Sequence, residues 1–358
     1  MRPTRIFKVD PFSPSQEYIQ EAVSCLCDGQ VICLPTDTVY GLGCNYLSEK
    51  ARERIYEIKG RSFSKPLAIA VYDVSLIENF IFPLPLWVYK VADNLLPGPL
   101  TVVLPYLESE TLAFRIPSSL LCLRILEEFS NPIWLTSANR SGYEDCFSGE
   151  EVIKEFNGVV DLIIDEGETR FRQPSTVIRM GNEEIEIIRQ GPITKDQLMR
   201  VVTTKNIMFV CTGNSCRSVM AEALFSKYVG KLRPELEGKI KCMSCGTTTI
   251  EGLPASDSTL EILKREEGID FSTHKATECG FWNLKRQDVI FVAQQNHLRY
   301  IKENYPYFKD KVYLLLEYVD LPFEGGYDIP DPIGRSDEFY YRILALIKEA
   351  VMRLIRRL

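Results

Sequence analysis

A buried strand, a polar loop and a helix follow one another directly in the second half of the chain. Residues 207–210 form a short, continuous apolar run, which is typical of a strand buried on both faces of a parallel sheet. A loop rich in glycine, asparagine and serine comes next, and residues 219–225 combine strong helix formers with helical apolar spacing. This order predicts an α/β fold.

The length of the chain predicts its number of domains. At roughly 150 residues per domain, 358 residues predict two or three domains. The short polar stretch at residues 203–206 marks the boundary, so we expect domains at 1–203 and 204–358. The first domain also shows α/β patterning, with strands expected at residues 31–34, 67–71, 100–104 and 133–135 and a helix at 49–58. The pattern does not give the directions of these strands.

Composition and charge exclude several classes of protein. The net charge of −7 argues against an overall basic coat for nucleic acid. No run approaches the ~18 apolar residues of a membrane span, and no apolar stretch follows the charged N-terminus, so we expect no membrane segment or secretory signal. The odd count of 11 cysteines indicates reduced thiols and a cytoplasmic location. Only Cys242 and Cys245 have metal-like spacing, so we expect no metal site.

The loop after the buried strand contains Cys211 and Arg217 with five residues between them. A loop from the carboxyl end of a parallel strand to a helix N-terminus directs its amides to one point, where they bind phosphate and stabilise a thiolate. Cys211 is therefore the expected nucleophile, and Arg217 offers a planar fork for two phosphoryl oxygens. Gly213 and Asn214 tolerate left-handed backbone, and Ser218 can donate to the thiolate. The alternative, an ordinary buried cysteine, leaves the arginine and the small residues unexplained.

A phosphoryl-cysteine route also needs an acid for the leaving group. Asp331 lies in a loop before a helix expected from about Asp337, and the proline that follows Asp331 holds it extended. Taken alone, this Asp-Pro pair would be a simple turn.

These residues resemble the low-molecular-weight protein phosphatase family over residues 206–358. The resemblance implies a doubly wound, four-stranded parallel sheet and no cofactor. Cys211 would be the nucleophile, Arg217 would bind the phosphate, and Asp331 would act as general acid and then base. The rest of the phosphate loop would be formed by Thr212, Gly213, Asn214, Ser215, Cys216 and Ser218. The family also implies that Asn214 and His274 brace the loop and that Cys216 protects Cys211 as a disulfide under oxidation.

The residue at position 215 bears on the choice of phosphoprotein substrate. Tyrosine phosphatases of this family usually carry a bulky apolar residue there, whereas its arginine phosphatases carry threonine. Ser215 is small and polar. The residue after the Asp331-Pro332 pair is Ile333, so this part of the cleft has no aromatic residue at its border. A binding cleft without aromatic side chains binds phosphotyrosine weakly. Phosphoarginine and phosphotyrosine both remain candidate substrates.

Basic residues on separate short loops of the first domain alternate with serine, threonine and glycine. This pattern predicts a cleft for a polyanion and a small polar ligand. Taken singly, Lys59 and Arg61 would be solvated charges at a helix end. The segments are residues 35–42, 59–67, 97–101, 114–117, 136–142, 174–177 and 188–191.

In this order the segments resemble the YrdC/YciO family of threonylcarbamoyl-AMP synthases, over roughly residues 15–195. The family implies a twisted, mixed α/β domain that makes threonylcarbamoyl-AMP from ATP, bicarbonate and L-threonine, for a modification of tRNA. Mg²⁺ would arrive with the nucleotide. The residues implied to contact ATP are Lys59, Arg61, Thr111, Asn139 and Arg189, with Ser148 as a substitute in the altered loop 143–148. Those implied to contact threonine and its carbamoyl group are Thr36, Arg115 and Ser137.

The two resemblances together predict a bifunctional enzyme, a threonylcarbamoyl-AMP synthase fused to a cysteine-dependent protein phosphatase. Its expected partners are ATP, bicarbonate, L-threonine, tRNA or the tRNA-modification machinery, and phosphoproteins. The alternative is that the first domain binds tRNA or double-stranded RNA without catalysis. In that case its basic loops would bind the RNA phosphates, and RNA binding would depend steeply on salt concentration.

Overall fold

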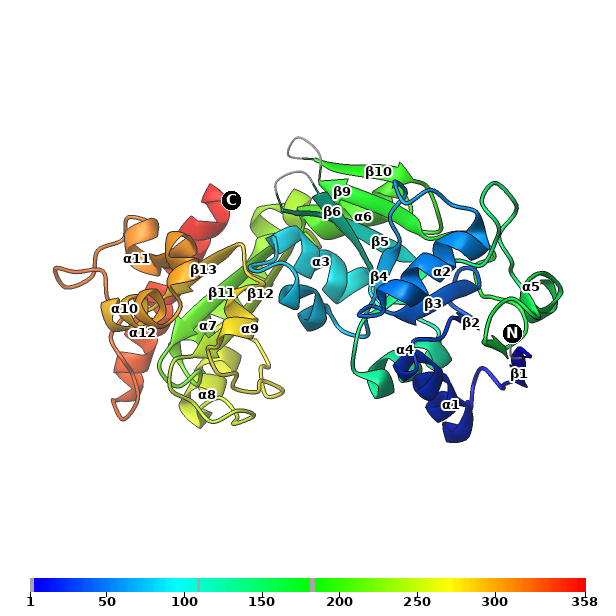
Figure 1. The fold of residues 1–358 in the computed structure, drawn as a ribbon. Coiled ribbons are helices and arrows are strands. Elements are labelled where there is room, and N and C mark those ends of the chain that lie inside the picture. The colour runs from blue at the N-terminus through cyan, green and yellow to red at the C-terminus, as the bar shows by residue number, and fades with distance from the viewer. Residues whose placement is uncertain (1–2, 108–109, 181–183) are drawn as a thin grey trace. The chain divides into compact units, whose positions relative to one another are not determined.

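The computed structural model describes residues 3–107, 110–180 and 184–358. The chain forms two compact units, Met1–Val202 and Thr203–Leu358, which are shown as ribbons in Figure 1. No helix in the described ranges has both the length and the apolar character to cross a membrane.

The first unit is built on a mixed sheet in which ten described strands run in the order β1-β8-β2-β3-β7-β4-β6-β5-β9-β10. Four neighbouring pairs are parallel (β1/β8, β2/β8, β4/β6 and β5/β9), and the other five are antiparallel. The predicted mixed α/β domain is therefore confirmed. The strands are β1 Arg5–Lys8, β2 Ile32–Leu34, β3 Gly41–Asn45, β4 Ala68–Ala70, β5 Leu100–Tyr106, β6 Glu110–Arg115, β7 Ile133–Ser137, β8 Leu162–Asp165, β9 Thr176–Met180 and β10 Ile185–Arg189.

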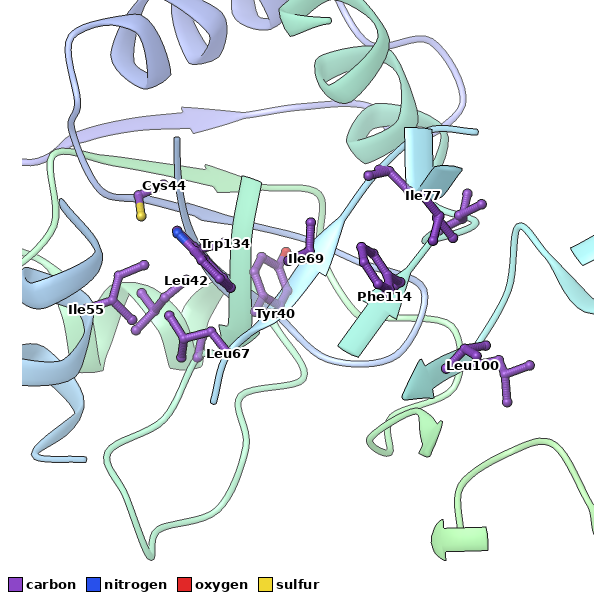
Figure 2. Close-up of a cluster of buried hydrophobic side chains, with 14 of the residues drawn as sticks. Tyr40, Leu42, Cys44, Ile55, Leu67, Ile69, Ile77, Leu100, Phe114 and Trp134 are labelled. Carbon is purple, nitrogen blue, oxygen red and sulfur yellow. The ribbon is translucent and has the colours of Figure 1, made fainter. Parts of the chain in front are cut away.

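Helices cover both faces of this sheet, because its strands alternate buried side chains between two cores. Ile32 and Leu34 pack in the core with helices α1 and α4, whereas Cys33 between them faces the core with α2, α3, α5 and α6. Figure 2 shows the second core, where Leu42 lies near Ile55 of α2, and Ile69 and Phe114 belong to the same buried cluster. The helices are α1 Gln16–Cys27, α2 Glu49–Lys59, α3 Leu86–Leu95, α4 Leu120–Phe129, α5 Gly149–Phe156 and α6 Lys195–Thr203, with a 3₁₀ turn η1 at Val74–Asn79.

Local sequence signals fix both ends of helix α2. The Ser48 side chain accepts a hydrogen bond from the Ala51 amide at the start of the helix. Gly60 ends it in the left-handed conformation, with φ of 58°. The expected helix at 49–58 is thus present as Glu49–Lys59.

The second unit has a four-stranded parallel sheet in the order β12-β11-β13-β14, which confirms the predicted topology. The first strand of the unit, β11, lies between β12 and β13, so the order of strands reverses at its carboxyl end. Ligands bind at such switch points in open parallel sheets. The strands are β11 Lys205–Cys211, β12 Ile240–Gly246, β13 Val289–Val292 and β14 Val312–Leu314.

Two cores flank the second sheet. Phe209 faces the core with α7, α8 and α12, and its neighbours Met208 and Val210 face the core with α10. The helices are α7 Arg217–Leu232, α8 Asp257–Glu267, α9 Phe281–Leu284, α10 Gln295–Asn304, α11 Leu315–Tyr318 and α12 Asp337–Arg357, with 3₁₀ turns η2 Pro234–Leu236 and η3 Pro306–Lys311. The covering of both faces by helices makes this sheet doubly wound.

Candidate active sites

The phosphate loop of the second unit begins at Cys211, the last residue of β11, and ends at Cys216, which precedes α7. Cys211 is buried, and Asn214 adopts the left-handed conformation with φ of 50°. The neighbouring strand β12 ends at Gly246, where a Cβ atom would lie 2.6 Å from the Thr212 carbonyl oxygen and 2.9 Å from the Asn214 nitrogen. Only glycine lets the loop approach β12 this closely.

Asn214 organises a network that ends at the Cys211 sulfur. Its side-chain amide donates to Ser218 Oγ at 3.0 Å and to Ser244 Oγ at 2.7 Å. His274 Nε2 lies 3.0 Å from the Asn214 carbonyl oxygen, so both predicted braces of the loop are present. Because Ser218 Oγ accepts from Asn214, its own hydrogen is free to donate to Cys211 Sγ, which is 3.0 Å away. A donor in this position stabilises a thiolate.

Glu222 extends this network and was not anticipated from the sequence. The Ser244 hydroxyl donates to Glu222 Oε2 at 2.6 Å and accepts from the Asn214 side chain. Glu222 therefore fixes the orientation of the hydroxyl that holds Asn214. Burial raises the pKa of Glu222 above its ordinary range. The glutamate lies on α7, one and a half turns after Arg217.

The guanidinium of Arg217 is buried and held on two sides. Its Nη1 atom donates to Gln294 Oε1 at 2.6 Å and to the Ile329 carbonyl oxygen at 3.0 Å. Its Nη2 atom pairs with the Asp331 carboxylate and donates to Thr212 Oγ1 at 3.4 Å. The Nε atom is buried and has no hydrogen-bond partner. The fold therefore brings Arg217 and Asp331 together, although 114 positions separate them.

Gln294 and His297 were also missed by the sequence argument. Both follow β13, the strand beside β11, and so lie at the carboxyl edge where the phosphate loop begins. That position is itself a usable signal, because polar residues after neighbouring parallel strands converge at one edge. His297 Nε2 lies 2.9 Å from Thr212 Oγ1.

The first unit contains a cavity of about 510 Å³ on one face of its sheet. Thr111 and Arg115 of β6 line it together with Thr101 of β5 and Arg179 of β9. Thr111 and Arg115 are four residues apart on the same face of their strand, which is roughly 13 Å. The predicted residues on the wall are Thr36, Arg61, Thr111, Arg115, Ser137 and Arg189. Among the described residues, no aspartate or glutamate lines this cavity.

Arg115 is fixed from behind by Asp37, a residue that the sequence argument did not select. Arg115 Nη2 donates to Asp37 Oδ1 at 2.7 Å, and both side chains are buried. The Arg115 Nε and the Asp37 Oδ2 have no partner. The ion pair sets the direction of the guanidinium, and the Nε hydrogen has no partner in the protein.

Arg189 is anchored at another part of the wall. Its Nε and Nη2 atoms donate to the carbonyl oxygen and the hydroxyl of Ser175, each at 3.1 Å. The Ser175 hydroxyl lies 2.8 Å from Thr101 Oγ1. Burial lowers the pKa of Arg189 from its ordinary value. Ser175 therefore has a positioning role in the wall that the sequence pattern did not assign.

Lys59, Asn139 and Ser148 do not line the cavity. Lys59 is buried, and its ammonium donates to the Ser137 carbonyl oxygen at 2.5 Å and to both the carbonyl and side-chain oxygens of Asn139 at 2.8 Å. It thus holds the loop that presents Ser137. The Ser148 hydroxyl accepts from the Glu151 amide as the N-cap of α5. These geometries make Lys59 a support of the wall and Ser148 a helix cap.

Within residues 3–107, 110–180 and 184–358, no three histidine, cysteine, aspartate or glutamate side chains are grouped so that they could hold a metal ion. Fold and sites define a two-domain enzyme with a basic cleft in one unit and a cysteine-centred phosphate loop in the other.

The first domain matches the Sua5/YciO/YrdC family, described as telomere recombination, over residues 24–191. The threonylcarbamoyl-AMP synthase of Pseudoalteromonas translucida is 31% identical over 173 residues, which are 45% of this chain and 92% of that protein. The synthase of Pyrococcus abyssi is 33% identical over 215 residues, or 58% of this chain. The chain belongs to the threonylcarbamoyl-AMP synthase family. It spans 63% of the length of the P. abyssi relative.

The second domain matches the low molecular weight phosphotyrosine protein phosphatase family over residues 206–358. A solved protein tyrosine phosphatase from T. tengcongensis is 34% identical and covers 43% of this chain and 100% of its own, with a TM-score of 0.39. A solved structure of P. abyssi Sua5 complexed with L-threonine shares the fold, with a TM-score of 0.53, 21% identity and coverage of 97% and 98%. Both families consist of enzymes, so the alternative of an RNA-binding module without catalysis is not favoured.

Proposed function

We propose that the first domain synthesises threonylcarbamoyl-AMP from ATP, bicarbonate and L-threonine, and that the second hydrolyses phosphorylated proteins through a phosphocysteine. The proposal for the first domain depends above all on the cavity over β6, β5 and β9, which is lined by cations and hydroxyls. Such a wall suits a nucleotide triphosphate and an amino acid carboxylate, and the synthase relatives support it.

We assign the cavity to two ligands. Arg115 is oriented by Asp37 and shares the cavity wall with Thr36 and Ser137, so we assign these three residues to the threonine carboxylate and the carbamoyl group. We assign the ATP phosphates to Thr111, Arg61 and Arg189, which line the same cavity. Catalysis there is positioning and charge neutralisation, because no acidic side chain lines the described wall to act as a base.

The same wall bears on the metal and on the product. With arginines and no carboxylates, it suits Mg²⁺ that is bound through the nucleotide phosphates and water. We assign the product to tRNA modification in the cytoplasm, where thiols such as the free cysteines of this chain stay reduced.

Pyrophosphate release tests the synthase assignment. Purified protein with ATP and Mg²⁺ should release pyrophosphate only when both threonine and bicarbonate are present. Arg115→Ala should raise the threonine concentration needed for half-maximal rate, whereas Arg124→Ala, at an exposed arginine of α4, serves as the matched control. Salt-dependent RNA binding without pyrophosphate release would overturn the assignment.

The phosphatase assignment depends on the hydrogen bond between Ser218 Oγ and Cys211 Sγ at the start of α7. The Cys211 sulfur attacks phosphorus, and the bond from phosphorus to the leaving group breaks. Asp331 protonates the leaving group and then removes a proton from the water that hydrolyses the phosphocysteine. Arg217 neutralises the phosphoryl oxygens with its positive charge, and its Nε hydrogen is the one without a partner in the protein.

Phosphoarginine is our preferred substrate class. Ser215 is half-buried, and its hydroxyl lies 3.8 Å from Cys216 Sγ, a weak contact that leaves it available to a polar leaving group. Side-by-side hydrolysis of phosphoarginine and phosphotyrosine peptides decides the preference. A wide preference for phosphotyrosine would reject phosphoarginine but leave the phosphocysteine route intact.

A further inference from the structure

The Thr212 hydroxyl and the His297 imidazole lie beside the reacting atoms. The mechanism proposed above assigns no role to either side chain. Thr212 directly follows Cys211 and is half-buried, and His297 lies in the first turn of α10 with 1% of its surface exposed. His297 Nε2 is 2.9 Å from Thr212 Oγ1, whereas its Nδ1 is buried and has no partner.

The unpartnered Nδ1 decides where the imidazole proton lies. A proton on Nδ1 would bury an N–H donor without an acceptor, which native structures rarely do. A proton on Nε2 uses the hydrogen bond to Thr212 and leaves only an unprotonated nitrogen buried. Burial, and then the charge of Arg217, lower the pKa of His297 to about 4, so the ring is neutral and has a single N–H to place. His297 therefore donates from Nε2 to Thr212.

This assignment also fixes the Thr212 hydroxyl. Its oxygen accepts from His297 Nε2 and from Arg217 Nη2, at 2.9 Å and 3.4 Å. A hydroxyl oxygen has two acceptor positions and one hydrogen, so both acceptor positions are taken and the hydrogen must donate elsewhere. The described residues give this hydrogen no acceptor. Arg217 Nη2 also pairs with Asp331, which places the hydroxyl where the phosphoryl group and the acid meet.

We propose that Thr212 donates a hydrogen bond to a phosphoryl oxygen of the substrate and that His297 is the positioning residue that turns the hydroxyl toward it. The proposal rests on the phosphatase function proposed above. It adds a side-chain donor to the backbone amides and Arg217, and it gives the buried, neutral histidine a task.

Substitutions at position 212 test the donor. A hydrogen bond to a charged group contributes enough for about a tenfold to hundredfold effect. Thr212→Val should lower kcat/KM for p-nitrophenyl phosphate by about tenfold or more and weaken inhibition by inorganic phosphate similarly. Thr212→Ser keeps the hydroxyl and should restore most of both. Thr273→Val is the matched control, because Thr273 is exposed and lies outside the phosphate loop.

Substitutions at position 297 test the positioning role. His297→Phe should reduce kcat/KM in the parent but have no further effect in the Thr212→Val background. A merely structural histidine would give additive losses. His297→Gln, whose amide can donate to Thr212, should recover activity. Thermal unfolding of each variant identifies losses that come from misfolding.

Phosphate binding separates this inference from the proposed function. Calorimetry with inorganic phosphate on the Cys211→Ser protein needs no turnover, so it tests the Thr212 donor even if the parent hydrolyses nothing. A parent without phosphatase activity would reject the proposed function. Folded Thr212→Val protein that keeps both kcat/KM and phosphate affinity within about twofold of the parent would overturn the inference.

Discussion

Nucleotide binding by the first domain should weaken above pH 8 because Lys59 loses its proton there. Burial, followed by the charge of Arg61, lowers the pKa of Lys59 to about 8. The ammonium makes three hydrogen bonds, one to Ser137 and two to Asn139. A neutral amine has two hydrogens, so deprotonation removes one of these bonds together with the charge that strengthens the others. The wall of the cavity then loosens.

The size of the effect follows from the titration. One unit above a pKa of about 8, only about a tenth of the molecules keep the ammonium, so ATP affinity should fall between pH 7 and pH 9 by up to about tenfold, the limit at which the neutral form does not bind. Deprotonation of Lys59 does not itself destabilise the fold. The pKa of Lys59 is lower in the folded chain than its ordinary value of 10.5, so between pH 8 and 10.5 the unfolded chain binds more protons. The contribution of this group to stability therefore rises with pH in that window.

Titration of ATP into the protein between pH 7 and 9.5, without threonine or bicarbonate, measures the effect free of substrate ionisation. Lys59→Met should bind weakly at every pH, with a flat profile. Lys65→Met serves as the matched control, because Lys65 is an exposed lysine on the same cavity wall and its loss should leave the decline above pH 8 in place. A flat profile in the parent, or the same decline in Lys59→Met, would refute the reasoning.

Three further substitutions have defined outcomes. Asp37→Asn leaves the buried Arg115 without its carboxylate, so urea unfolding should show a loss of about 3 kcal/mol or more in the first domain; unchanged stability would contradict the role of the ion pair. Asp331→Asn should slow hydrolysis of phosphoarginine or phosphotyrosine peptides by about 10²–10⁴-fold but slow p-nitrophenyl phosphate less, and equal losses would make Asp331 structural. Ser215→Ile should shift preference from phosphoarginine toward phosphotyrosine by about tenfold, measured as the ratio of kcat/KM values, and a parallel loss of both activities would contradict it.

The sequence was most informative where structure is local. The apolar run before Cys211 and the helical spacing after it predict β11 and α7, and both elements extend further than the pattern shows, to Lys205–Cys211 and Arg217–Leu232. The loop between them is built from adjacent residues, so its chemistry is visible before the fold is known.

The strand β3 shows where the pattern fails. Gly41–Asn45 contains two glycines and little β-forming character, yet it lies in the sheet between β2 and β7. At Gly41 a Cβ atom would lie 2.6 Å from a Leu135 methyl group. A larger residue at position 41 would force the Leu135 side chain to move, and no local signal contains this contact with a distant strand.

Contacts between side chains that are distant in sequence are the second feature that the sequence pattern does not predict. The pattern alone makes Lys59 a solvated charge at a helix end, whereas the fold surrounds its ammonium with three oxygens of residues 137 and 139. The partners His297 and Thr212 are 85 positions apart and meet only because β13 pairs with β11. Such contacts depend on topology rather than on spacing along the chain.

One cross-experiment on the full chain tests the central claim that two independent active sites share it. Parent, Cys211→Ser and Arg115→Ala proteins are each assayed for threonine- and bicarbonate-dependent pyrophosphate release and for phosphopeptide hydrolysis. We expect Cys211→Ser to lose only hydrolysis and Arg115→Ala to lose only synthesis. Loss of both activities in either folded variant, or of neither, would contradict the account.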